Sequence, residues 1–116
     1  MRIGPGAFLG WNVSCHCAEA LTIEADAVVS ERCVLTDSRH PRTPMAVPMF
    51  HHVVAKPTTV AANSWLGAGT VVGAGITVGP GAIVGANSVV TKDVPPGWLA
   101  AGSPARHIRE LEVEGP

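Results

Sequence analysis

Aliphatic residues recur at every sixth position through the second half of the chain, at Val54, Val60, Leu66, Val72, Val78, Val84 and Val90. A period of six fits neither the 3.6-residue period of an α-helix nor the two-residue alternation of a lone strand. The residue three positions after each aliphatic residue is, except at Pro57, one that tolerates a positive φ angle. These residues are Asn63, Gly69, Gly75, Gly81, Asn87 and Asp93. The pattern predicts a short strand and a sharp corner in every repeat.

Three such repeats close a triangular coil of eighteen residues, and successive coils stack about 4.8 Å apart through parallel strand pairing. The aliphatic residues then point inward, and each coil buries its apolar face on its neighbours. The N-terminal part carries the same signal at Ile3, Leu9, Ile23, Val29 and Leu35, whereas residues 13–22 are out of step and indicate an expanded side or a bulge. The sequence therefore predicts an all-β fold, a parallel β-helix.

The period breaks at two further places. Residues 41–53 are rich in proline and hold two adjacent histidines, which is typical of a loop that projects from the side of the helix. The repeat ends at Pro95-Pro96-Gly97, and Ser103-Pro104 then looks like a helix N-cap followed by proline at the first helical position. We expect a short C-terminal helix over residues 105–112, and a single domain over residues 1–116 with a cap at 95–116.

Composition and charge exclude several classes of function. The net charge of −1 gives no field that would attract nucleic acid or an anionic membrane. Residues 57–91 hold no charged residue, but Asn63, Pro80 and Asn87 interrupt this run, and the spacing of its GxxxG motifs is itself six. We therefore expect no membrane insertion. An odd number of cysteines and no signal peptide favour the cytoplasm.

The run GANSVVTKDVPPGWLAAGSPARHIR, residues 85–109, resembles the C-terminal signature of the hexapeptide-repeat acyltransferases. These include the maltose, galactoside and saccharide O-acetyltransferases, and the likeness extends over residues 23–109. The resemblance implies a left-handed helix, a homotrimer with active sites between subunits, and acetyl-CoA as co-substrate. The family usually carries a segment before its repeats that helps to line the acceptor site, whereas the repeats here begin at Ile3.

His40 is the candidate catalytic residue. It follows Leu35 by five positions and stands beside Pro41, at the mouth of the projecting loop. Acyl transfer from a thioester to a hydroxyl requires a base that removes the hydroxyl proton, and imidazole, with a pKa near 6.5, suits this at neutral pH. The residues alone also allow an exposed loop histidine without chemistry. The resemblance favours the base, because the family's catalytic histidine lies at this place.

Three other polar residues are candidates for the acceptor site. Asp37 could orient the imidazole of His40 or bind acceptor hydroxyls, although an acid at a solvent-facing corner is an equal alternative. Asn12 and Glu19 lie where relatives place polar groups of the acceptor site. His51 and His52 are interpreted as loop surface, and His16 lies between two cysteines without the second motif that a metal site needs.

The resemblance also indicates a coenzyme A site of six residues: Ala68, Ala86, Thr91, Lys92, Arg106 and Arg109. The two alanines match positions that line the pantetheine arm, and small side chains permit close approach. Lys92 and the two arginines could hold phosphate, the arginines from one face of the expected helix. The alternative is a solvated C-terminal face. Trp65 and Trp98 could stack on adenine or cover coil ends.

Three functions remain as hypotheses. The leading one is an acetyl-CoA-dependent O-acetyltransferase that transfers acetyl to a hydroxyl of a saccharide or similar small acceptor, with His40 as general base and no metal. The second is a non-catalytic β-helix scaffold. The third is a zinc enzyme of the γ-carbonic anhydrase kind, which requires a His-x4-His pair that His16, His40, His51, His52 and His107 do not supply.

Overall fold

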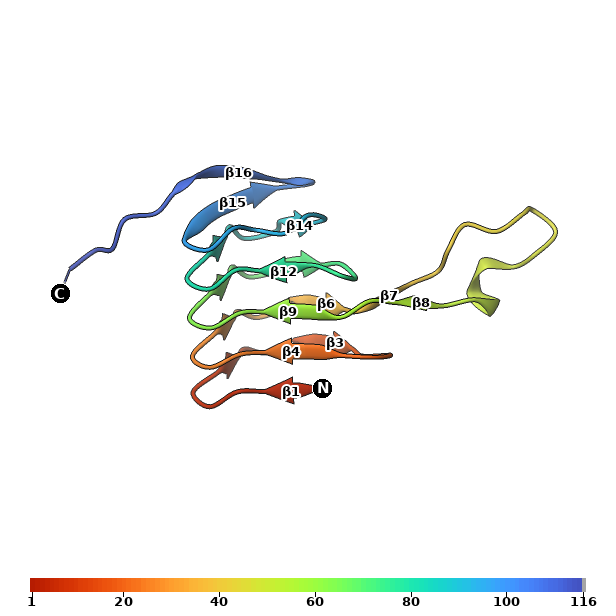
Figure 1. Cartoon of the computed structure of the whole chain (residues 1–116), viewed down its shortest axis with the longest axis horizontal. Coiled ribbons are helices and arrows are strands. Elements are labelled where there is room, and N and C mark those ends of the chain that lie inside the picture. Colours follow the sequence, from red (N-terminus) through yellow and green to blue (C-terminus); the bar gives the residue numbers. More distant parts are fainter. Residues whose placement is uncertain (116) are drawn as a thin grey trace.

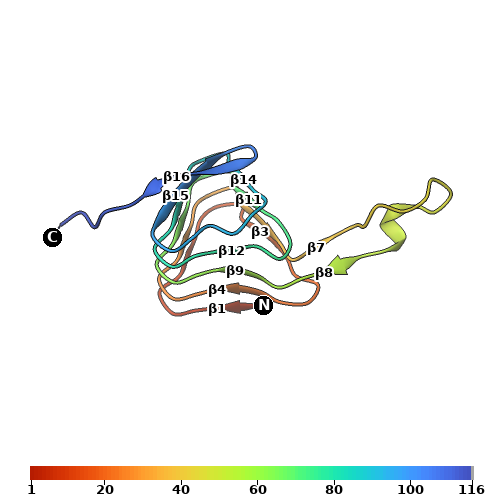
Figure 2. The ribbon, with the colours of Figure 1, turned by 45° about the horizontal axis from the view of Figure 1, so that its top comes forward.

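The fold is a stack of triangular coils, described for residues 1–115 in a computed structural model. Figure 1 shows the coils from the side, with β1 at one end of the stack and β16 at the other. Figure 2 shows that each coil has three sides.

Each side is a sheet of stacked strands. The first side holds β1 (Arg2–Ile3), β4 (Leu21–Ile23), β9 (Thr58–Val60) and β12 (Thr77–Val78). The second holds β2 (Phe8–Leu9), β5 (Val28–Val29), β10 (Trp65–Leu66), β13 (Ile83–Val84), β15 (Trp98–Gly102) and β16 (Ala105–Glu110). The third holds β3 (Ser14–His16), β6 (Val34–Thr36), β11 (Val71–Val72) and β14 (Val89–Val90). Within these three sides, pairing is parallel except between β15 and β16. The sequence-based prediction of a parallel β-helix is therefore confirmed.

The core consists of the aliphatic residues of the six-residue period. Val60, Leu66, Val72, Val78, Val84 and Val90 are buried. The pairing partners of Leu66 are Val29 in the coil below and Val84 in the coil above. Val54 departs from the prediction and is 42% exposed, because Lys56 and Pro57 separate it from the coil that begins at Thr58.

Corners between the sides depend on the residues with positive φ. Asn63, Gly69, Gly75, Gly81 and Asn87 all adopt φ between 56° and 76°, as predicted. Asp93 does not belong to this group. Its carboxylate instead accepts a hydrogen bond from the Thr77 amide at 2.8 Å, and Arg32 occupies a corner (φ 60°) that the pattern did not mark. We call the corners first (between the first and second sides), second (between the second and third) and third (between the third and first).

The first coil is slightly expanded at the third corner. Ile3 pairs with Ile23, a separation of 20 residues, whereas Val60 pairs with Val78, a separation of 18. The two additional residues lie in the turn 17–20, which follows β3. The irregularity expected within residues 13–22 is therefore an expanded corner rather than a bulged strand.

An arm projects from the third corner (Figure 1), where the loop was predicted. It starts with β7 (Ser38–Arg39), which pairs antiparallel with β8 (Val54–Ala55), and its outer part contains the short 3₁₀ helix η1 (Met49–His51). The ladder is two residue pairs long, Ser38 with Ala55 and Arg39 with Val54. The arm therefore leaves the coil after β6 and returns to it before β9.

The C-terminal helix expected over residues 105–112 is wrong, because Ala105–Glu110 forms β16, antiparallel to β15. The Ser103–Pro104 pair forms the turn of this hairpin rather than a helix cap. The strand pairs with the edge of β15 that the end of the stack would otherwise leave open. Pro116, the last residue of the expected cap, lies outside the described residues. No helix in residues 1–115 has the length and hydrophobicity needed to cross a membrane.

Candidate functional site

His40 lies on the arm, directly after β7, and its side chain is exposed. Its Nδ1 atom is 2.7 Å from the main-chain oxygen of His52 on the returning limb. A carbonyl oxygen can only accept a hydrogen bond, so Nδ1 carries the proton. In a neutral imidazole the Nε2 atom then holds the free lone pair. The contact fixes the ring in the tautomer that a base acting through Nε2 requires.

The outer part of the arm is apolar. Its exposed hydrophobic side chains are Met45, Val47, Met49, Phe50 and Val53. The ring of His51 lies edge-on to Phe50, with ring centroids 4.4 Å apart. Neither His51 nor His52 contributes a side-chain hydrogen bond within residues 1–115, and the contact that His52 makes with His40 comes from its backbone.

Asp37 is placed differently from both interpretations of the sequence. Its side chain is 0% exposed, so it does not lie at a solvent-facing corner. Its carboxylate oxygens accept hydrogen bonds from three consecutive amides of the expanded turn, those of Ala18, Glu19 and Ala20, at 2.7–2.8 Å. The carboxylate therefore neither contacts the imidazole of His40 nor faces an acceptor. Assigning it to the acceptor site was wrong, because the two additional residues of this coil create a row of donors that the carboxylate fills.

The pKa of Asp37 reflects two opposing effects. Desolvation of the buried carboxyl raises its pKa, whereas the amides of residues 18–20 and of Asp37 itself lower it. The hydrogen bonds prevail, and the pKa lies below its usual value. Asp37 is accordingly a charged, fully bonded group at neutral pH.

Asn12 and Glu19 are both exposed, but they lie apart in the coil. Asn12 lies at the second corner of the first coil, where its φ of 57° accounts for the residue type. Glu19 lies in the turn 17–20 at the third corner, which is also where the arm begins. Within one chain the structure places Glu19, but not Asn12, at the same corner as His40.

A groove of about 380 Å³ runs along the second corner. It brings together Ala68 and Ala86, the two residues predicted to line a pantetheine arm, with Gly67, Gly85 and Trp65. The coils approach closely here, since a Cβ atom on Gly67 would lie 2.6 Å from the backbone nitrogen of Ala86.

The rest of the groove lining combines a repeat position, Val84, with residues that carry no signal in the repeat pattern. This part of the lining is Ser30, Glu31, Ile83 and Val84. The indole Nε1 of Trp65 donates to the Ser30 hydroxyl at 3.0 Å, which holds the ring against the groove wall. Sequence reasoning missed Ser30 and Glu31, because corner positions on the outer surface accept many residue types.

Arg106 and Arg109 lie on β16, where simple alternation would place residues three apart on opposite faces. Their pairing is irregular: Arg106 lies opposite Ala101 and Arg109 opposite Leu99, while Ile108 has no partner. Residues directly opposite each other share a face, and Leu99 and Ala101 share one because they are two apart. The bulge at Ile108 therefore returns both arginines to one face. The expected juxtaposition is present, although the helix that was to produce it is not.

Thr91 and Lys92 follow β14 at the third corner and are exposed. They lie at the opposite end of the third side from Ala86. Trp98 is half-buried and packs against the core cluster at the end of the coil stack. His107 lies beside it, with ring centroids 6.1 Å apart, and its Nε2 is 3.0 Å from the Asp93 carbonyl oxygen. Trp98 therefore covers the end of the core.

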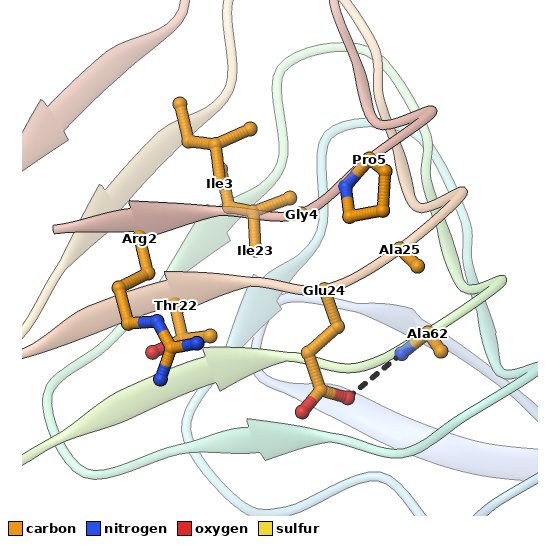
Figure 3. A pocket seen from close by; sticks show the side chains of 9 residues that line it. All are labelled: Arg2, Ile3, Gly4, Pro5, Thr22, Ile23, Glu24, Ala25 and Ala62. Atoms are coloured by element: carbon orange, nitrogen blue, oxygen red, sulfur yellow. Dashed lines mark hydrogen bonds between the residues drawn. The ribbon is translucent and has the colours of Figure 1, made fainter.

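A second groove lies at the first corner (Figure 3), between Arg2 and Glu24. Glu24 accepts a hydrogen bond from the Ala62 amide at 3.0 Å, which joins two coils. None of the residues predicted for a functional site lines this groove. Within residues 1–115, no three His, Cys, Asp or Glu side chains form a group that could hold a metal ion.

Comparison with known proteins gives relatives that are acetyltransferases. The sequence pattern "Bacterial transferase hexapeptide (six repeats)" matches residues 57–92. Galactoside O-acetyltransferase from Escherichia coli K12 is 31% identical over 118 residues, which cover 96% of this chain and 54% of that protein. A putative acetyltransferase from Staphylococcus haemolyticus is 59% identical over 58 residues, 50% of this chain and 30% of the relative. The chain thus spans about half, or less, of the length of these curated relatives.

Solved structures agree in fold. The polySia-specific acetyltransferase NeuO superposes with a TM-score of 0.84 at 27% identity, covering 98% of this chain and 53% of that one. Galactoside acetyltransferase in complex with coenzyme A gives 0.80 at 28% identity, with 96% and 60% covered. These neighbours are left-handed β-helices, which confirms the handedness that the resemblance implied. The chain therefore carries the bacterial transferase hexapeptide repeat and is similar over nearly its whole length to the hexapeptide-repeat acyltransferases, galactoside O-acetyltransferase among them.

Proposed function

We propose that the protein is an acetyl-CoA-dependent O-acetyltransferase and that His40 is its general base. The observation that carries the proposal is the 2.7 Å contact between His40 Nδ1 and the His52 carbonyl oxygen. It leaves Nε2 as the free basic atom of an exposed ring, at the corner where the arm interrupts the six-residue repeat. The acyltransferase relatives support the reaction class.

The chemistry that this geometry supports is direct transfer. The acceptor hydroxyl loses its proton to Nε2 of His40 while its oxygen attacks the thioester carbonyl carbon. The new C–O bond forms and the C–S bond breaks, and the leaving thiolate of coenzyme A takes the proton from Nε2, which restores the neutral imidazole. The His52 carbonyl stabilises the imidazolium that forms in between, because it accepts from Nδ1–H in both protonation states. A saccharide or similar hydroxyl compound is the proposed acceptor.

Coenzyme A is proposed to lie along the second-corner groove. Ala68 and Ala86 line the groove and leave room for an extended chain beside the coil backbone. Lys92, Arg106 and Arg109 are the cations proposed for the phosphate groups, with Thr91 beside them, and the shared face of the two arginines permits one phosphate to contact both. Galactoside acetyltransferase, which binds coenzyme A in its solved structure, supports the choice of ligand.

A homotrimer is proposed because the outer faces of the prism differ. The first side presents polar residues outward: Arg2, Thr22, Thr59 and Thr77. The second presents Phe8, Val28, Trp65, Ile83 and Leu99, and the third presents Val34, Val71 and Val89. Apolar outer faces suit contact between copies in a closed ring. The arm and the groove lie at different corners of one copy, so the proposed site combines the arm of one copy with the groove of the next.

The proposed compartment is the cytoplasm. Cys15, Cys17 and Cys33 are all unpaired, which agrees with a reducing environment. Cys33 is buried and lies 3.3 Å from the Gly67 carbonyl oxygen, and burial raises its pKa, so it acts as a small core residue.

The test is release of coenzyme A thiol from acetyl-CoA in the presence of a panel of hydroxyl acceptors. We expect release that depends on an acceptor, and a loss of at least roughly 100-fold in His40→Ala. His16→Ala is the matched control, since His16 is also exposed and has no hydrogen bond from its ring within residues 1–115. Equal rates in wild type and His40→Ala would remove His40 from the reaction.

A further inference from the structure

We propose that Asp37 is a positioning residue: its buried carboxylate attaches the start of the arm to the expanded turn and thereby determines the position of His40. The proposal rests on the proposed function insofar as it concerns catalysis. Asp37 itself cannot touch a substrate, because its side chain is 0% exposed.

The first step of the argument is the nature of the turn. Ala18, Glu19 and Ala20 present three successive amides to one point, and such a row of N–H groups forms a concave anion-binding site. In this chain the anion is supplied internally by Asp37, 17–19 residues away in sequence. The turn exists because this coil, from Ile3 to Ile23, is two residues longer than the coil from Val60 to Val78.

The second step is the position of Asp37 within the arm. Its main chain also makes two hydrogen bonds, one to β3 and one to the returning limb of the arm. The Asp37 amide donates to the His16 carbonyl at 3.2 Å, and the Asp37 carbonyl accepts from the Lys56 amide at 2.8 Å. One residue therefore connects the end of β3, the expanded turn and the returning limb of the arm. Asp37 lies directly before β7 and is the last residue of the coil before the arm.

The third step is the weakness of the arm beyond this point. The β7–β8 ladder has two residue pairs, and a two-stranded ladder alone is marginally stable in water. His40 follows the ladder, three residues from Asp37, or about 10 Å of extended chain. The contact from His40 to His52 joins the two limbs to each other but not to the coil. The orientation of the two limbs, and with them of His40, relative to the coil thus depends on the attachment at Asp37.

Two substitutions test this attachment. Asp37→Asn keeps the size of the side chain but replaces one acceptor oxygen with a donor, which leaves at least one of the three amides without a partner. Asp37→Glu keeps the charge and moves the carboxylate by one methylene. The second variant serves if the first does not fold, because its anion remains available to the turn.

The controls separate positioning from general destabilisation. Glu24→Gln changes another carboxylate that accepts a backbone hydrogen bond, at the first corner and away from the arm. Val29→Ala removes core volume from the same coil as Asp37, on the second side. Val29→Ala should lower stability through the cavity it leaves, and neither control touches the attachment of the arm.

The readouts are amide hydrogen exchange, the rate at which diethyl pyrocarbonate modifies His40, and steady-state kinetics. For both Asp37 variants we expect faster exchange in residues 18–20 and 38–56, an altered His40 modification rate, and a kcat lower by roughly 10- to 100-fold. The KM for acetyl-CoA should not change, because Ala68 and Ala86 lie at another corner and Lys92, although at the third corner, follows β14 and is not part of the arm. The two controls should keep the wild-type kcat at temperatures where they are folded.

Two results would overturn the proposal. One is an unchanged kcat in an Asp37 variant whose arm exchanges faster, and the other is a kcat that falls equally in Val29→Ala. A wild-type protein that transfers no acetyl group would sink the proposed function instead. In that case amide hydrogen exchange and the modification rate of His40 still decide whether Asp37 positions the arm. Wild-type exchange and modification rates in both Asp37 variants would refute the proposal.

Discussion

The imidazole of His40 is held by the backbone of His52, whose carbonyl oxygen lies 2.7 Å from Nδ1. The partner is a main-chain atom, so the side chain at position 52 takes no part in the contact. This relationship connects the two limbs of the arm and selects the tautomer of the candidate base in one interaction.

His52→Ala should therefore keep nearly full activity, whereas His40→Ala loses it. The carbonyl of residue 52 remains in the first variant and continues to accept from Nδ1–H. The measurement is kcat/KM with acetyl-CoA for both variants. A loss in His52→Ala comparable to that in His40→Ala would show that the side chain at position 52, rather than its backbone, is used.

A larger side chain at Ala68 should obstruct the second-corner groove. We expect Ala68→Leu to raise the KM for acetyl-CoA by about 10-fold or more, since 380 Å³ of open groove offers little spare room beside an extended chain. Isothermal titration with coenzyme A gives the affinity directly. Ala25→Leu, at a half-buried position in the first-corner groove, is the matched control and should bind coenzyme A as the wild type does.

Removing either arginine of β16 should weaken coenzyme A binding by roughly 5- to 10-fold, equal to about 1 kcal/mol, with less effect at high salt. Arg106→Ala and Arg109→Ala should lose similar amounts, because the bulge at Ile108 places both on one face. The affinities of wild type and variants at low and high salt provide the check. A loss confined to one arginine would argue against a shared phosphate.

Asp37 should make the fold sensitive to acid. Its folded-state pKa is depressed, so its contribution to the free energy of unfolding is complete above the unfolded pKa of about 4 and disappears as the pH falls through the folded value. Thermal unfolding between pH 7 and pH 2 should show that the difference in Tm between wild type and Asp37→Asn shrinks below about pH 4. A difference that is the same at all pH values would mean that the charge is not what stabilises the turn.

Alanine substitutions at two positions of the six-residue series should differ sharply in their effect on the free energy of unfolding. Leu66→Ala should cost about 2–5 kcal/mol, because Leu66 is 0% exposed between two coils. Val54→Ala should change the free energy of unfolding by less than about 0.5 kcal/mol, because Val54 lies on the arm. Denaturant unfolding of both variants measures the difference, and equal losses would place Val54 in the core.

The fold could be predicted from sequence largely because its core repeats. Positions such as Leu66 and Val84 must be aliphatic in every coil, and corner positions such as Gly69 must allow a positive φ, so the same signal returns every six residues. Val54 shows the limit of this reasoning: it shares the phase of the series without sharing its environment. The C-terminal strand was misread as a helix, because Ser-Pro fits a helix start equally well and the open edge of β15 is invisible in a sequence.

The candidate site was less accessible to prediction. His40 could be found from the break in the period beside Pro41, and Ala68 and Ala86 meet in one groove as expected. The acceptor for the His40 ring is a backbone carbonyl, which leaves no trace in residue type. For Asp37 the sequence indicates an acceptor-site residue or an exposed acid but not a buried one, because the amides that bury it come from a turn whose two additional residues matter only once the coils are stacked.

The most direct test of the account is formation of the acetylated acceptor by His40→Ala, with and without added imidazole. If His40 is the base, the variant forms ester at least roughly 100-fold more slowly than the wild type, and imidazole in the vacated space restores part of the rate. The recovery should saturate with imidazole concentration and be absent in Ala68→Leu, whose defect lies elsewhere. Ester formation by His40→Ala at the wild-type rate would contradict the central claim.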